Sequence, residues 1–419
     1  MGCSKNLVDS ELLMGQLEKG GIDIVHNSDS YDAKTVIINT CGFINDAKQE
    51  SIDTILDFIQ AKKSGFIDRV YVMGCLSQRY KKELLADIPE VDEYFGVNNI
   101  KDIVSLLDID YKNELTGERY ISTPSHYAYL KISEGCDRTC SFCAIPLIRG
   151  KHISRTIEDI INEAKHLVKK GVKEFILIAQ DLTYYGIDIY KKQQLNDLIN
   201  RLADITGVEW IRLHYAYPSN FPVEIIKTMK ERDNVCKYLD LPVQHINNTV
   251  LKNMRRGHSK DQIISLLNLI KSEIPEIYLR TTVMVGHPGE GPDEFEELKQ
   301  FIRNTRFDRL GAFTYSCEED TFSAQNFIDT VNENEKQNRM EEIMNIQSEI
   351  SADLNALKIG KTFKTIIDRK EGDYYIGRTE ADSPEVDNEV IIPDNTLKTG
   401  SFYDVKIISA NEFDLFGEL

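Results

Sequence analysis

Hydrophobic and polar residues alternate in blocks along most of the 419-residue chain, as short β-branched runs followed by longer amphipathic stretches. In residues 1–110 this pattern predicts strands at 35–39 and 69–73 and helices at 44–63 and 78–85. Asp9 or Ser10 is placed to cap an earlier helix that ends at Gly20-Gly21. Alternation of strand and helix indicates a parallel sheet with crossover helices.

A polar passage at 111–126, which contains Thr116-Gly117 and Thr123-Pro124, predicts a linker to a second domain at 127–357. The strands predicted there lie near 127–133, 175–179, 210–214, 238–241, 278–285 and 309–315. The helices lie near 157–170, 194–205, 222–232, 259–273, 292–304 and 334–357. Six strands with intervening helices predict a partial (β/α)6 barrel similar to a TIM barrel, with its active site at the carboxyl ends of the strands.

The last residues, 358–419, have a different pattern. Short β-like runs are separated by Gly, Asp and Pro, and they lie at 361–370, 374–379, 390–392, 402–409 and 412–417. This pattern predicts a small antiparallel β-barrel, so the chain is expected to be an α/β protein of three domains.

Composition and charge say more about the cellular location of the protein than about its activity. No run of about 18 apolar residues exists to span a membrane, and the N-terminus has no apolar secretory segment. We therefore expect a cytoplasmic protein with reduced cysteines, which act more often as ligands than as disulfides. The net charge of −18 argues mildly against nucleic acid and favours basic partners.

Three cysteines in eight residues, Cys136, Cys140 and Cys143, form what we call the core triplet. A tetrahedral zinc site or a simple four-iron cluster takes four protein ligands, so three thiolates on a four-iron cube leave one iron open to a substrate or cofactor. The alternative is a structural zinc loop, because Cys140 and Cys143 have zinc-knuckle spacing.

A second set, Cys3, Cys41 and Cys75, is called the N-terminal triplet here. Cys41 and Cys75 follow predicted strand ends, and residues just past the carboxyl ends of parallel strands converge on one crevice. The alternative is three buried cysteines that act as small hydrophobic residues, which is the role we expect for Cys236 and Cys317. Cys317 lies beside a predicted strand end, so contact with the active site stays open.

The spacing C-x3-C-x2-C with an aromatic residue before its last cysteine resembles the signature of the radical S-adenosylmethionine (SAM) enzymes. Over nearly the whole chain the sequence resembles the radical-SAM methylthiotransferases, of the RimO type. The motifs that carry this resemblance are Gly2-Cys-Ser-Lys-Asn-Leu-Val-Asp-Ser-Glu11, Ala179-Gln-Asp-Leu-Thr-Tyr-Tyr-Gly186, Leu239-Asp-Leu-Pro-Val-Gln-His245, Met254-Arg-Arg-Gly257, Val285-Gly-His-Pro-Gly-Glu290 and Phe313-Thr-Tyr-Ser316.

The resemblance implies a flavodoxin-like N-terminal domain, a radical SAM core and a TRAM-like barrel. It also implies SAM and two [4Fe–4S] clusters as cofactors, with the core triplet and the N-terminal triplet as their metal ligands. Phe142, Gln180 and Arg280 would face SAM, with 285–290 supporting its adenine, although each has an ordinary structural alternative. No catalytic residue beyond the clusters is assigned.

One departure concerns the start of the chain. Family members carry a short strand before the first cysteine, whereas only Met1 and Gly2 precede Cys3 here. A start at an internal methionine would leave the sheet one strand short and put the position of Cys3 in doubt.

The resemblance further implies that the substrate is the β-carbon of an aspartate in small-subunit ribosomal protein S-twelve, with an electron donor such as a flavodoxin-like reductant. Seven Lys/Arg against thirteen Asp/Glu give residues 361–419 a net charge of −6, which favours a basic protein over transfer RNA. The short basic run of Arg255, Arg256, His258 and Lys260 is read as a solvated face. Two alternatives stay open: a transfer RNA methylthiotransferase, and a non-catalytic iron–sulfur scaffold.

Overall fold

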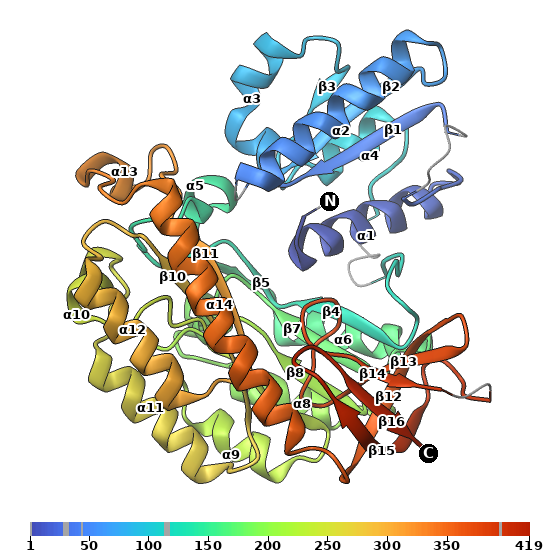
Figure 1. Ribbon diagram of the computed structural model, residues 1–419. Coiled ribbons are helices and arrows are strands. Elements are labelled where there is room, and N and C mark those ends of the chain that lie inside the picture. The colour runs from blue at the N-terminus through green and yellow to red at the C-terminus, as the bar shows by residue number, and fades with distance from the viewer. Residues whose placement is uncertain (1, 28–32, 43–44, 113–117, 394–395) are drawn as a thin grey trace.

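Three main sheets organise the chain in the computed structural model, which describes residues 2–27, 33–42, 45–112, 118–393 and 396–419 (Figure 1). Two of the sheets are open and parallel, and the third closes into a barrel. The predicted fold class is therefore confirmed: an α/β protein with a parallel N-terminal sheet, a partial barrel and a small terminal β-barrel. The exact domain boundaries stay a prediction, and residues 113–117 of the expected linker lie outside the described residues.

The N-terminal sheet is parallel, with strand order β1-β2-β3. Its strands are β1 (Thr35–Thr40), β2 (Arg69–Gly74) and β3 (Glu93–Tyr94), and its helices are α1 (Ser4–Lys19), α2 (Asn45–Lys63), α3 (Cys75–Asp87) and α4 (Ile100–Leu106). The expected first residue of the second helix, Ile44, lies outside the described residues, as does Met1. A cavity of about 570 Å³ lies between α1, residues 22–27 and β1.

The start of α1 corrects the sequence prediction. The helix begins at Ser4, with Cys3 as its extended N-cap, rather than at Asp9 or Ser10. Asp9 is buried inside the helix, where it pairs with Lys131 and Arg149 of the next domain. A short polar side chain that suits a helix cap in sequence is thus used for a contact between domains.

The central sheet has six parallel strands in the order β11-β10-β9-β8-β7-β4. They are β4 (Tyr127–Lys131), β7 (Glu174–Ile178), β8 (Trp210–Leu213), β9 (Val235–Asp240), β10 (Tyr278–Val285) and β11 (Arg309–Thr314). The helices around it are α5 (Ile145–Arg149), α6 (Ile157–Lys169), α7 (Ile187–Tyr190), α8 (Leu195–Ala203), α9 (Glu224–Glu231), α10 (Asn248–Asn253), α11 (Lys260–Glu273), α12 (Pro292–Thr305), α13 (Phe322–Asn326) and α14 (Glu333–Ala356), with the 3-10 turn η2 (Leu182–Tyr184). A two-stranded ribbon, β5 (Ser133–Glu134) with β6 (Ile153–Ser154), flanks the sheet.

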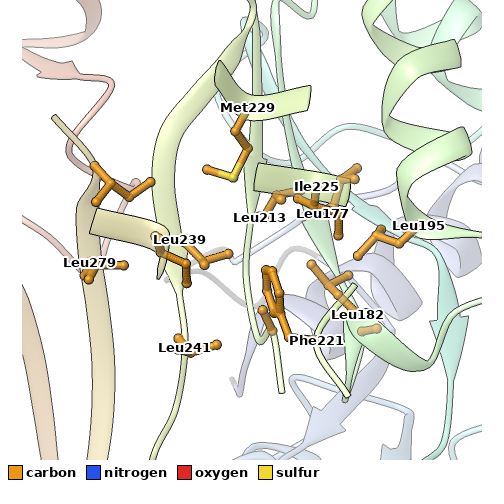
Figure 2. Packing of buried hydrophobic residues seen from close by; sticks show 14 of the residues in the cluster. Leu177, Leu182, Leu195, Leu213, Phe221, Ile225, Met229, Leu239, Leu241 and Leu279 are labelled. Atoms are coloured by element: carbon orange, nitrogen blue, oxygen red, sulfur yellow. The ribbon is translucent and has the colours of Figure 1, made fainter. Parts of the chain in front are cut away.

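Aliphatic side chains fill the space between this sheet and its helices. Figure 2 shows Leu177, Leu213 and Leu239 from neighbouring strands packed with Ile225 and Met229 of α9. Burial of this kind is the main favourable contribution to folding. The short helices α5, α7, α10 and α13 escaped the sequence prediction because four to six residues give too little periodicity to read.

The terminal barrel closes in the order β12-β13-β14-β16-β15. Its strands are β12 (Thr362–Glu371), β13 (Tyr374–Thr379), β14 (Val390–Ile392), β15 (Phe402–Ala410) and β16 (Leu415–Glu418). The pairing is antiparallel except between β14 and β16, which run parallel. In the described part of the chain, no helix is long and apolar enough to cross a membrane.

Buried ion pairs join this barrel to the central sheet. Arg378 of β13 donates to Glu174 of β7 at 2.8 Å, and Asp382 pairs with Arg309. The loop after β13 also brings Asp387 to Tyr238, whose hydroxyl donates to it at 2.7 Å. Asp382 and Asp387 therefore face the neighbouring domain and are not free for a basic partner.

Candidate active site

The core triplet lies on the loop between β5 and α5. Gly135 opens this loop with φ at +72°, and a Cβ atom there would lie 2.1 Å from the carbonyl oxygen of Lys151, so the position requires glycine. The backbone N–H of Cys136 donates to Gly150 at 3.1 Å, and that of Cys143 donates to Cys140 at 3.2 Å. The loop is thereby folded back on itself and keeps its three thiols together.

The surroundings of the core triplet suit thiols that bind a cation. The pKa of Cys136 is raised to about 11 and that of Cys143 to about 12, mainly by burial and in part by the neighbouring thiol of Cys140. Without a cation these sulfurs are protonated near neutral pH. A bound metal centre supplies the positive charge that a cluster of thiolates needs.

The N-terminal triplet assembles from three separate segments. Cys3 precedes α1, Cys41 follows β1 and Cys75 begins α3 directly after β2. Because β1 and β2 are parallel neighbours, their carboxyl ends lie at the same edge of the sheet. Gly42 packs so closely that a Cβ atom there would lie 2.8 Å from the backbone of Leu76.

The thiols of this triplet lie close enough to act on one another. Burial raises the pKa of Cys75 to about 11; Arg149 opposes this rise, and the nearby thiols of Cys3 and Cys41 add to it. Cys41 and Cys75 are buried, whereas Cys3 is exposed. The structure therefore brings together the three cysteines that the sequence placed at strand ends.

The two triplets meet across the boundary between domains. Cys75 packs in one apolar cluster with Val97, Ala144 and Ile148, and Ala144 directly follows the last cysteine of the core triplet. Figure 1 shows α5 lying between the N-terminal domain and the central sheet. The two triplets thus lie near one boundary between the two domains.

A polar contact between the same two domains supports this arrangement. Glu318, which follows β11, accepts from Lys48 of α2 at 2.7 Å and pairs with Arg79 of α3. The side chains of Arg79 and Glu318 are both almost fully buried. The N-terminal domain is therefore held against the core on two sides of the triplets.

Each triplet offers three thiolates, the donor type that holds an iron–sulfur cube. Within the described residues, no group of three His, Cys, Asp or Glu side chains is arranged to hold one metal ion. Cysteines of a cube bind different irons, so they stand farther apart than ligands of one zinc ion. None of the eight cysteines, all of which lie in the described ranges, forms a disulfide.

A cavity of about 310 Å³ opens over the core triplet. All three cysteines line it, together with the cationic side chains of Arg138, Lys151 and Arg255 and the ring of Phe322. Arg138 is fixed by Asp181, which accepts from its Nε at 2.8 Å. Two carboxylates, Asp137 and Asp320, also line the cavity, so the three cations leave its lining with a small positive excess that suits an anionic carboxylate.

Two of the residues expected to face SAM lie beside the core triplet. The ring of Phe142 meets the ring of His287 edge to face, with centroids 6.2 Å apart, which joins the cysteine loop to the motif at 285–290. Gln180 follows β7 and donates to Glu134 at 2.9 Å, while its own amide oxygen is buried without a hydrogen-bond partner among the described residues. An unpartnered acceptor of this kind is suited to a ligand donor.

The third residue, Arg280, is engaged elsewhere. Its guanidinium lies 3.4 Å from Asp240 and 3.3 Å from Asp387 of the barrel loop. A SAM-facing role would require this side chain to share or leave those carboxylates, so that role stays a prediction.

The basic run at 255–260 corrects the expectation of a solvated face. Arg256 is buried, and its Nη1 donates to the sulfur of Cys140 at 3.3 Å. Arg255 packs over Phe322 at the cavity, and burial lowers the pKa of His258 to about 3. Arg255 is nevertheless exposed, and Lys260 forms a half-exposed pair with Glu297, so these two cations fit the expectation. Sequence alone does not show which cation of such a run turns inward.

Comparison with protein families divides the chain into three matched regions. Residues 1–96 match an uncharacterized protein family, UPF0004, residues 130–302 match the radical SAM superfamily, and residues 359–419 match the TRAM domain. The fold and the site therefore define a radical SAM enzyme that carries an additional cysteine-bearing domain and a TRAM barrel.

Curated relatives narrow this class. The chain is 56% identical to the ribosomal protein uS12 methylthiotransferase RimO of Phocaeicola vulgatus, over 100% of this chain and 98% of that protein. Identity is 56% to the RimO of Cytophaga hutchinsonii and 52% to that of Flavobacterium johnsoniae, each over 100% of this chain and 96% of the relative. The chain belongs to the RimO family of radical SAM methylthiotransferases. The cofactors of this family are SAM and two [4Fe–4S] clusters.

Solved structures share the fold at low sequence identity. The cobalamin-dependent SAM radical enzyme OxsB matches with a TM-score of 0.51 and 14% identity, over 82% of this chain and 53% of that one. The radical SAM methyltransferase TsrM from Kitasatospora setae matches with a TM-score of 0.50 and 14% identity, over 67% and 63%. The chain spans less than two thirds of either protein, and these matches support the fold alone.

Proposed function

We propose that this protein transfers a methylthio group to the β-carbon of an aspartate in ribosomal protein uS12, the S-twelve protein of the small subunit. The observation that carries the proposal is the meeting of two cysteine triplets at one domain boundary, where Cys75 packs against Ala144 and Ile148. A single-cluster radical enzyme has no need of a second triplet. Full-length identity of 52–56% to uS12 methylthiotransferases supports the substrate.

We propose the core triplet as the ligands of the SAM-binding cluster and the N-terminal triplet as the ligands of the auxiliary cluster. When bound, the first cluster supplies one-electron cleavage of SAM to a 5′-deoxyadenosyl radical, and the second supplies the inserted sulfur. The chain's own residues orient and enclose the reactants. Phe142 and Gln180 would border SAM, and the buried contacts around Glu318 hold the two domains together.

The conditions of the reaction follow from the same assignment. We propose a cytoplasmic location, because the thiols of both triplets must stay reduced before the clusters form. We also propose a flavodoxin-like protein as the electron donor. No membrane is involved in this proposal.

The proposal is tested in two measurements. Anaerobic reconstitution is expected to give about eight irons per chain, four for each cluster. Incubation with SAM, a reductant and either uS12 or transfer RNA is then expected to give deoxyadenosine and a methylthio mass shift on uS12.

Each alternative has its own outcome. A mass shift on transfer RNA alone would show that transfer RNA, and not uS12, is the substrate. Two filled clusters without any SAM cleavage would indicate a scaffold.

A further inference from the structure

The residue that links the two triplets is Arg149, the last residue of α5. It belongs to the core domain and lies six positions after the last cysteine of the core triplet, yet its guanidinium reaches the N-terminal domain. Its Nη2 donates to the sulfur of Cys75 at 3.4 Å and also to the side-chain oxygen of Asn6. With only 2% of its side chain exposed, it is shielded from solvent.

Carboxylates hold the other edge of this guanidinium. Nη1 lies 3.1 Å from Asp9 of α1 and 3.0 Å from Glu134 of β5. Lys131 pairs with the same two carboxylates, so two cations and two anions balance within the network. The carboxylates therefore occupy Nη1 and leave Nη2 to donate to the sulfur of Cys75, in the direction that the planar guanidinium fixes.

Asn6 makes this contact depend on the geometry of the whole N-terminal triplet. Its amide nitrogen donates to the carbonyl of Thr40 at 3.0 Å, one residue before Cys41. The thiol of Cys75 donates to the Asn6 oxygen at 3.4 Å, and a Cys75 thiolate has no proton for this bond. Arg149 then remains as the donor to both Asn6 and the sulfur.

A similar arrangement occurs at the core triplet, where buried Arg256 donates to Cys140. Each triplet thus has one buried arginine on one of its sulfurs. Hydrogen bonds to cluster sulfurs and nearby positive charge stabilise the more negative, reduced state, which raises the reduction potential.

We propose that Arg149 is a positioning residue that holds Cys75 in place and raises the reduction potential of the auxiliary cluster. The inference rests on the proposed assignment of Cys3, Cys41 and Cys75 as ligands. Because Arg149 extends from the loop of the core triplet, it also makes the auxiliary site depend on closure of the two domains.

The test uses the full-length chain with Cys136, Cys140 and Cys143 replaced by alanine, reconstituted so that only the N-terminal triplet can hold iron. Iron content and the midpoint potential from an EPR-monitored titration are measured for this parent, for Arg149→Gln and for Arg149→Lys. We expect a more negative midpoint potential in Arg149→Gln. We expect a smaller negative shift in Arg149→Lys, which keeps the charge but not the fork.

Arg79→Gln is the matched control. Arg79 is also a buried arginine between the two domains, but it contacts Glu318, the carbonyl of Glu319 and the ring of Tyr80 rather than a cysteine. Its midpoint potential is expected to equal that of the parent.

The possible results separate the two proposals. A parent that binds no iron would overturn the ligand assignment itself. A parent with about four irons, in which the midpoint potential of both Arg149 variants is unchanged or shifts only as far as in Arg79→Gln, would overturn the role of Arg149 and leave the ligand assignment standing. If Arg149→Gln loses its iron, Arg149→Lys decides: retained iron with a more negative potential supports the role, and an unchanged potential overturns it.

Discussion

The two cysteine triplets reach the same kind of site by opposite routes. The core triplet occupies eight consecutive residues on one glycine-initiated loop, so its geometry is local. The N-terminal triplet spans 73 residues and exists only when α1, β1 and β2 are assembled. A local site can form early and tolerate movement of distant parts, whereas an assembled site depends on the fold around it.

This difference extends to the surroundings of the sulfurs. Cys140 receives its arginine from within the same domain, whereas Cys75 receives Arg149 from the other domain. The hydrogen bond to Cys75 therefore requires the two domains to be in contact. The core site does not need that contact to form.

The largest effects are expected from two variants, each of which lacks one cysteine of one triplet. Cys140→Ala is expected to abolish formation of both deoxyadenosine and methylthio-uS12. Cys41→Ala is expected to keep SAM cleavage but to abolish the methylthio product. Each variant should retain about four of eight irons, measured by iron assay beside chromatography of the nucleoside. Loss of all iron from Cys41→Ala would mean that the triplets share a single centre.

A large effect on stability is expected at Asp9, which joins α1 to the central domain through Lys131 and Arg149. Asp9→Asn leaves Lys131 and Arg149 buried with one carboxylate between them, and removing one partner of a buried pair costs about 3 kcal/mol. Urea unfolding of the full chain, followed by fluorescence and circular dichroism, measures the change in its first transition.

The matched control is Asp53→Asn, which changes an exposed carboxylate on α2 of the same domain. We expect its transition to match that of the parent. Equal destabilisation by both variants would show that the Asp9 network does not stabilise the domain contact.

The next effect concerns the core side and depends on pH. Burial lowers the pKa of His287, which packs on Phe142, to about 4 from an ordinary value of 6.5. Because this pKa is depressed in the folded state, the unfolded chain binds the proton more readily. The contribution of neutral His287 to the free energy of unfolding is therefore complete above about pH 6.5 and is lost as the pH falls toward 4, on the order of 3 kcal/mol in total.

Thermal unfolding of the cluster-free chain between pH 7 and 4 checks this prediction. His287→Gln, which does not titrate, is expected to lose less stability than the parent over that interval. Identical pH slopes in the two proteins would show that His287 does not contribute to acid sensitivity.

The order of strands and helices was predictable because each element carries its own periodicity. The six strands of the central sheet and the five of the barrel lie within a few residues of the predicted runs. The core triplet was visible for the same reason, since its spacing is a property of one short segment. Local information was sufficient for these features.

Contacts between segments far apart in the chain were not predictable from the same information. Asp9 was expected to cap a helix and Arg256 to lie on a solvated face, yet both are buried partners of residues far along the chain. The charge argument from residues 361–419 had the same weakness, because Asp382 and Asp387 turn toward the core. Pairing across domains leaves no periodic trace in the sequence.

The smallest effects are expected at the two cysteines that belong to neither triplet. These variants test whether the six cysteines of the two triplets are the complete set of ligands. Cys236 is fully buried beside Trp210 and Tyr238, so Cys236→Ala is expected to cost about 1 kcal/mol for a deleted heavy atom. Cys317 is exposed, and Cys317→Ser is expected to leave stability within about 0.5 kcal/mol. Both variants should keep the full iron content. Loss of iron from Cys317→Ser alone would place its sulfur among the ligands and make the site an assembly of seven cysteines rather than two sets of three.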